Sequence, residues 1–64
     1  MKAIAYHDPF NGFQGFIIQG VGHVYYKRQD GGWCWVIAHR AAERFGTKQE
    51  AEAAIIEINE QEKA

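Results

Sequence analysis

Five residues in this chain are of types that could carry metal or nucleophilic chemistry: His7, Asp8, His23, Cys34 and His39. A structural zinc site needs ligands in pairs, at spacings such as C-x2-C or H-x3-H, and these five residues form no such pair. Cysteine catalysis would require one of the histidines to lie within hydrogen-bond reach of the Cys34 thiol and act as its base. A domain of 64 residues also has little room for a substrate cleft. The sequence therefore predicts a protein that is not an enzyme, with no catalytic residue, no metal site and no cofactor.

A second combination of residue types has a sharper use. Basic side chains lie near aromatic ones in the middle of the chain, and single-stranded nucleic acid is bound by stacking bases on aromatic rings beside basic groups. The candidate binding residues are Tyr25, Tyr26, Lys27, Arg28, Trp33, Trp35, Arg40 and Arg44. Arg40 and Arg44 would share one face if their segment were helical.

The charge balance weakens a nucleic-acid role. The net charge is −1, made up of +2 over residues 1–46 and −3 over residues 47–64. A blanket attraction to nucleic acid or to an anionic membrane is therefore excluded. Gly20-Val21-Gly22 is an isolated G-x-G without the strand–turn–helix context of a phosphate loop, so it predicts a tight turn or a bend.

Length and composition indicate one small domain over residues 1–64. Hydrophobic residues make up 47% of the chain, as in globular proteins. No apolar run approaches the roughly 20 residues of a membrane span, and the amino-terminal stretch does not resemble a secretory signal. The single cysteine, Cys34, excludes a disulfide framework and favours a reducing compartment. We therefore expect a cytoplasmic protein.

Short segments with β propensity, separated by turn signals, predict the elements that position these residues. Strands are expected at 2–7, 13–20, 23–28 and 33–38. Asn11-Gly12 favours a hairpin turn of type I′, in which both central residues have positive φ. Gly15 interrupts the second strand, where it indicates a bulge or a close backbone approach.

The pattern changes to a helical period near the carboxyl end. Thr47 and Glu50 have the spacing of a capping box, and the residues after them contain no glycine or proline. Ala51, Ala54, Ile55 and Ile58 recur at helical spacing. These signals predict a helix over about 48–61, whereas the segment 39–45 fits either a helical turn or the end of the last strand.

A sheet of three or four strands has two faces, and one helix covers only one of them. Neither face is plainly polar: Trp33, Trp35 and Ile37 share one side of the last strand, and Cys34, Val36 and Ala38 share the other. We expect the face opposite the helix to expose at least one tryptophan and one or two tyrosines. Three covers for it remain open: another part of the chain, a second copy of the protein, or a different partner.

The stretch from Trp33 to Ile55 resembles a pattern found in many short, uncharacterised bacterial and phage proteins, in which a strand bearing tryptophan precedes a terminal helix. The matching positions are Ala42, Phe45, Thr47, Glu50 and Ala51. The resemblance implies a compact accessory protein, of phage origin, without catalytic residues.

Together these observations predict an α+β domain, with an antiparallel meander of three or four strands and one carboxy-terminal helix on one face. The expected function is protein binding through the aromatic sheet surface, with a homodimer as one form. The alternative is a module that binds single-stranded nucleic acid.

Overall fold

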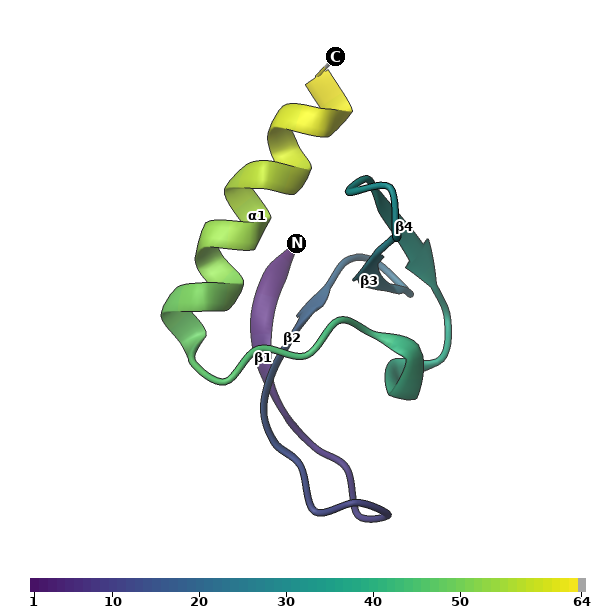
Figure 1. Cartoon of the computed structure of the whole chain (residues 1–64), viewed down its shortest axis with the longest axis vertical. Coiled ribbons are helices and arrows are strands. Elements are labelled where there is room, and N and C mark those ends of the chain that lie inside the picture. Colours follow the sequence, from purple (N-terminus) through teal and green to yellow (C-terminus); the bar gives the residue numbers. More distant parts are fainter. Residues whose placement is uncertain (64) are drawn as a thin grey trace.

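The computed structural model, which describes residues 1–63, confirms the expected α+β architecture (Figure 1). Four strands form one antiparallel sheet in the order β1-β2-β3-β4, and a single long helix follows. The elements are β1 (Lys2–His7), β2 (Gln14–Gln19), β3 (Val24–Lys27), β4 (Trp33–Val36), a 3-10 turn η1 (His39–Ala41) and α1 (Lys48–Lys63). The predicted strands 13–20, 23–28 and 33–38 are each shorter in the structure, and the helix is longer by two residues at its carboxyl end.

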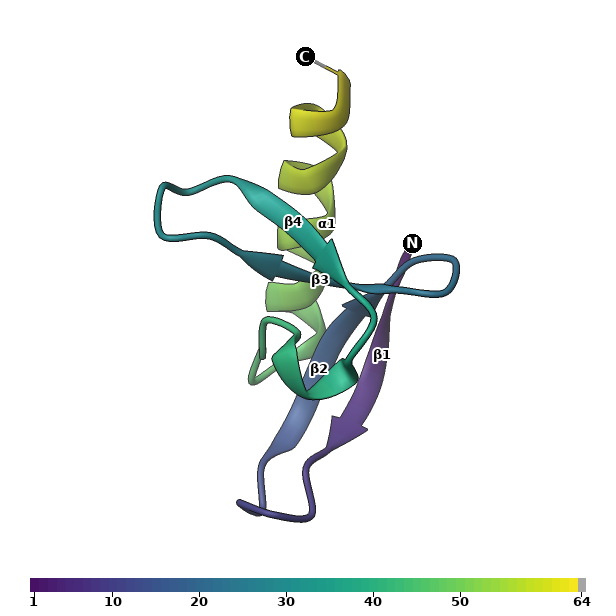
Figure 2. The same ribbon diagram turned by 90° about the vertical axis from the view of Figure 1, so that its right-hand side faces the viewer.

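The sheet consists of two hairpins that are joined at one point. Strands β1 and β2 pair along six residues, and β3 and β4 pair along four, but β2 and β3 pair only at Gln19 and Val24. The Gly20–Gly22 stretch between them is a tight turn, in which the Gly20 amide donates to the carbonyl of His23 at 2.8 Å. The β3–β4 hairpin therefore swings away and crosses the β1–β2 hairpin steeply (Figure 2).

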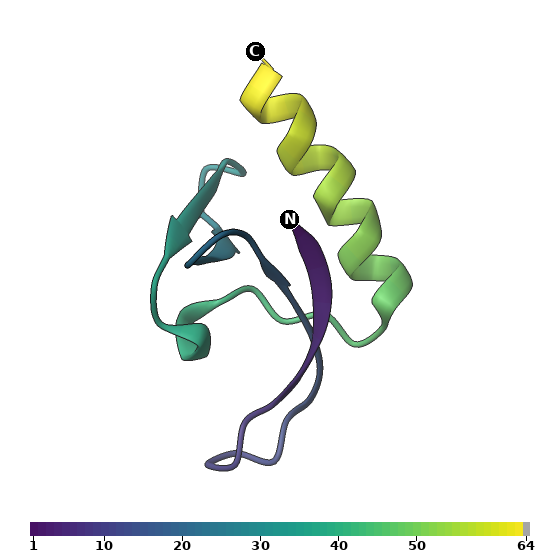
Figure 3. The same ribbon diagram turned by 180° about the vertical axis from the view of Figure 1, so that it is seen from behind.

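The segment after η1 fills the gap that opens between β2 and β3. The amide of Glu43 donates to the carbonyl of Tyr25, and Phe45 exchanges two backbone hydrogen bonds of 2.9 Å with Phe16. Figure 3 shows this segment crossing the sheet on its way to the start of α1. The helical alternative for 39–45 is therefore correct only for the 3-10 turn His39–Ala41, and the other alternative is wrong, because the last strand ends at Val36 and the extended chain at Phe45 pairs with Phe16 instead. The segment is not helical as far as Arg44.

Two glycine signals have different outcomes. At Gly15 an added Cβ would lie 2.4 Å from the carbonyl oxygen of Phe45, so this glycine allows the close backbone approach that the sequence indicated. The prediction of a type I′ turn at Asn11-Gly12 is wrong, because such a turn needs a positive φ at both residues, and only Gly12 has one, of 77°. The Gly12 amide donates to the carbonyl of Asp8, so the hairpin closes through a longer loop.

The helix begins as its capping signal predicts. The Glu50 amide donates to Thr47 Oγ1 at 3.2 Å, and the Thr47 hydroxyl donates to the Glu50 carboxylate at 3.1 Å. Ala51, Ala54 and Ile58 are buried and Ile55 is half-buried, which confirms the apolar stripe. The helix packs against β1 and β2 through this stripe.

Each face of the sheet has its own core, and this corrects the expectation of an open second face. Under the helix, the buried residues are Ile18, Tyr25, Trp33, Ala51, Ala54 and Ile58. On the opposite face, Ile17 and Val24 are fully buried beneath Ala42, with Ile4, Tyr6 and Val36 packed around them. The residues after β4 thus cover the second face of the sheet. The steep crossing of the two hairpins places this face next to η1 and Ala42.

Candidate interaction surface

Trp33 and Trp35 lie on the same side of β4 but in different surroundings. Trp33 is only 6% exposed and packs beneath α1, whereas Trp35 is 61% exposed. The helix packs on β1 and β2 and contacts β4 at Trp33 through Glu57 and Gln61, whereas no helix residue among 1–63 is hydrogen-bonded to Trp35. The exposed tryptophan therefore lies on the side of the sheet that the helix partly covers, not on the opposite face as the sequence suggested.

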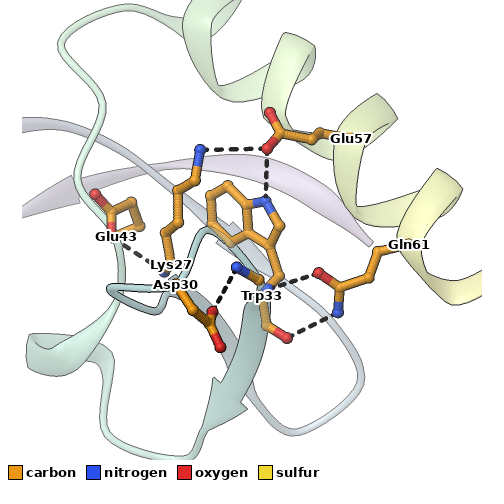
Figure 4. A network of polar contacts seen from close by, with 7 residues as sticks. Lys27, Asp30, Trp33, Glu43, Glu57 and Gln61 are labelled. Atoms are coloured by element: carbon orange, nitrogen blue, oxygen red, sulfur yellow. Dashed lines mark hydrogen bonds and ion pairs between the residues drawn. The ribbon is translucent and has the colours of Figure 1, made fainter.

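A polar network fixes Trp33 to the helix (Figure 4). Its indole Nε1–H donates to Glu57 Oε1 at 3.3 Å, and its backbone amide donates to Gln61 Oε1 at 2.6 Å. The Gln61 amide in turn donates to the carbonyl of Trp33 at 3.0 Å. The Lys27 ammonium lies 3.2 Å from Glu57 Oε1 and 5.8 Å from the centre of the Trp33 ring. Trp33 is thus a core residue with all three of its backbone and indole polar groups satisfied.

The two candidate tyrosines are also separated by the alternation of β3. Tyr25 is 8% exposed and belongs to the core under the helix, and burial, reinforced by the nearby Glu62 carboxylate, raises the pKa of its hydroxyl. Tyr26 is half-buried on the other side of the strand. They do not form one aromatic surface.

The four candidate cations are bound to other parts of the chain. Lys27 pairs with Glu57, Arg28 with Asp30 at 3.1 Å, and Arg44 with Asp8 at 2.6 Å. The Arg40 guanidinium lies 5.2 Å from the centre of the Phe10 ring. In the part of the chain that the structure describes, none of these contacts involves Trp35, so the cations do not line a common groove beside the exposed tryptophan.

The pair of Arg44 and Asp8 predicts a defined acid dependence. The Phe10 amide, followed by the Arg44 guanidinium, holds the pKa of Asp8 below its usual 3.8, although burial opposes the shift. Because the folded-state pKa is the lower one, Asp8 stabilises the fold fully above about pH 3.8, and this contribution is lost as the pH falls through the folded-state value. We expect Asp8→Asn to be less stable than the wild type at neutral pH and the difference to shrink in strong acid. Urea unfolding across the pH range measures this, and a constant difference would contradict it.

Three exposed apolar side chains belong to the end of the β3–β4 hairpin that is opposite its turn, where β3 begins and β4 ends. Besides Trp35, these are Ile37, 74% exposed two residues further along, and Val21, 95% exposed in the turn before β3. His23 lies next to two of these residues: its ring centre lies 5.2 Å from that of Trp35, and its Nδ1 lies 2.9 Å from the backbone carbonyl oxygen of Val21. We call Val21, His23, Trp35 and Ile37 the Trp35 surface.

The backbone of Trp35 adds to this surface, because β4 is an edge strand. Trp33 and Trp35 occupy equivalent register positions opposite Lys27 and Tyr25, so the outward backbone groups of both tryptophans point away from β3. Gln61 occupies those of Trp33. Within residues 1–63 nothing binds the outward amide and carbonyl of Trp35, which leaves a short open edge next to the exposed indole.

Several residues of this site could not be singled out from the sequence. In the expected strand 33–38, Ile37 shares a side with Trp33 and Trp35, which is a usable signal although β4 ends at Val36, whereas the sequence places Val21 only in a turn. Gln61 and Glu57 appear as solvated helix residues, since nothing local indicates that they bind Trp33.

The described residues hold no group of three or more histidine, cysteine, aspartate or glutamate side chains placed to bind one metal ion. No helix among residues 1–63 has the length and apolar character needed to cross a bilayer. Comparison with protein-family models, with curated proteins and with solved structures found no match.

Proposed function

We propose that the protein is a non-enzymatic binding protein that acts through protein–protein contacts of the Trp35 surface, first of all with a second copy of itself. The observation that carries this proposal is the 61% exposure of Trp35 in a chain that buries its other tryptophan. Exposed tryptophans are concentrated at protein interfaces because they supply a large apolar area with a single polar group. The resemblance to short phage and bacterial proteins supports an accessory role, and the lone Cys34 supports a cytoplasmic location.

A symmetric dimer would use both features of the surface at once. Two β4 edges related by a two-fold axis could exchange backbone hydrogen bonds at Trp35 while their indoles pack against Ile37 and Val21 of the other copy. A standard interface buries roughly 800 Å² per partner, whereas the whole chain exposes 4419 Å². The Trp35 surface comprises four residues, whereas a standard interface takes roughly 20–30 residues a side, so we expect a dimer that dissociates in the micromolar range or above.

The solution mass of wild type and Trp35→Ser tests the proposal. We expect the wild type to approach about twice the chain mass of 7.3 kDa as its concentration rises, at low and at high salt alike. Trp35→Ser should remain folded and raise the dissociation constant about tenfold or more, as loss of a central aromatic residue does at interfaces. Light scattering coupled to gel filtration measures both masses.

Ile56→Ser is the matched control, because Ile56 is 63% exposed on α1, away from the Trp35 surface. The Ile56→Ser protein should dimerise like the wild type. A wild type that stays monomeric at all concentrations, or a Trp35→Ser protein that dimerises equally well, would contradict the proposal. Binding of a single-stranded oligonucleotide that weakens steeply with salt would favour the nucleic-acid alternative instead.

A further inference from the structure

A second surface, away from the Trp35 surface, is a cleft between the amino-terminal half of α1 and the Lys27 end of β3. Its volume is about 310 Å³. Trp33 and Phe45 form an aromatic base, with ring centres 6.3 Å apart and ring planes at 23°. The lining residues are Lys27, Trp33, Glu43, Phe45, Glu50, Ala53, Ala54 and Glu57.

The charge of this lining is unbalanced. Three carboxylates face one ammonium, which gives −2, twice the −1 of the whole chain. Each carboxylate uses its Oε1 within the protein: Glu43 accepts the Lys27 amide, Glu50 the Thr47 hydroxyl, and Glu57 both Lys27 and Trp33. Among residues 1–63 the Oε2 atoms of all three have no hydrogen-bond partner, so each can accept a further donor.

Lys27 shows what kind of group this lining holds. Its ammonium lies over the Trp33 ring and against Glu57 at the same time, which combines a cation–π contact with an ion pair. A single lysine engages only one of the three carboxylates through its side chain. The remaining lining, with Glu43 and Glu50 beside the small side chains of Ala53 and Ala54, offers an apolar path for a methylene stem and acceptors for a second cation.

We propose that this cleft binds a lysine side chain presented by a partner protein, with its stem along Ala53 and Ala54 and its ammonium at the free Oε2 atoms of the three lining carboxylates, where Lys27 already holds Glu57. Charge complementarity and the aromatic base select a flexible cation with an apolar stem, and the resident Lys27 is its internal competitor. The proposal concerns a different surface from Trp35, so either can fail without the other.

The probe is the peptide acetyl-Gly-Lys-Gly-amide, titrated into isotope-labelled full-length protein and followed by NMR. We expect the Trp33 indole resonance and the amides of Ala53 and Ala54 to shift in a saturable way at millimolar peptide. The same peptide with norleucine in place of lysine has the stem without the charge, and it should cause no such shift. Equal shifts with both peptides, or none with either, would overturn the proposal.

Three variants test the placement of the charge. Lys27→Met removes the internal competitor and should bind the lysine peptide about three- to fivefold tighter, the effect of freeing one exposed ion pair. Glu50→Gln should weaken binding by a similar factor, and glutamine retains the helix cap. Glu52→Gln is the control, since Glu52 is exposed on α1 outside the cleft and should bind like the wild type. Weaker binding by Lys27→Met, or equal loss in Glu52→Gln, would assign the effect to general charge and refute the site.

Discussion

Replacing Trp33 with alanine is expected to unfold most of the protein at 25 °C. Truncation of a buried tryptophan costs about 3–5 kcal/mol of unfolding free energy, through lost apolar burial and the cavity that remains. A domain of this size has only about 3–5 kcal/mol in total. Trp33 also joins β4 to α1 through Glu57 and Gln61, and the variant loses the indole part of that connection.

Urea unfolding followed by circular dichroism measures this effect. Trp35→Ala is the matched control, because the same substitution two residues away removes an exposed side chain and should change the unfolding free energy by about 0.5 kcal/mol or less. If the two variants were equally stable, Trp33 would not be the residue that anchors the helix to the hairpin.

Ile17→Ala should destabilise the fold by about 2–5 kcal/mol, which is the usual cost for a fully buried isoleucine. Ile17 has no exposed surface and lies on the face opposite the helix, in the core with Val24 and Ala42. The size of the loss therefore measures whether the residues after β4 close this face in solution.

Ile56→Ala provides the comparison for that measurement, because Ile56 is exposed on α1. The Ile56→Ala protein should unfold at nearly the same urea concentration as the wild type. If Ile17→Ala lost no more unfolding free energy than Ile56→Ala, the second face of the sheet would be open. Such a result would restore the expectation of an exposed aromatic face opposite the helix.

The elements of this fold are predictable because their signals are local. The first strand is found with its bounds, and the helix begins one residue after Thr47 as the cap requires. The apolar stripe of the helix also identifies the residues that it buries. Each of these features depends on neighbours within four positions in the chain, which a sequence pattern records.

The features that were not predictable depend on contacts between distant residues. Phe45 is extended because it pairs with Phe16, and Trp33 is buried because Glu57 and Gln61 bring the helix onto it. The alternation of β4 correctly places Trp33 and Trp35 on one side. It cannot say where along the hairpin the helix stops covering that side, and this end point is what separates a core tryptophan from an exposed one.

The concentration dependence of the two indole N–H resonances in an NMR dilution series tests the central claim most directly. The account predicts that the Trp35 resonance moves steadily with protein concentration, because its ring enters the contact between two copies. The Trp33 resonance should stay fixed, because its N–H is bound to Glu57 inside each copy. If both resonances were constant, or if only that of Trp33 moved, the Trp35 surface would not be where the protein binds.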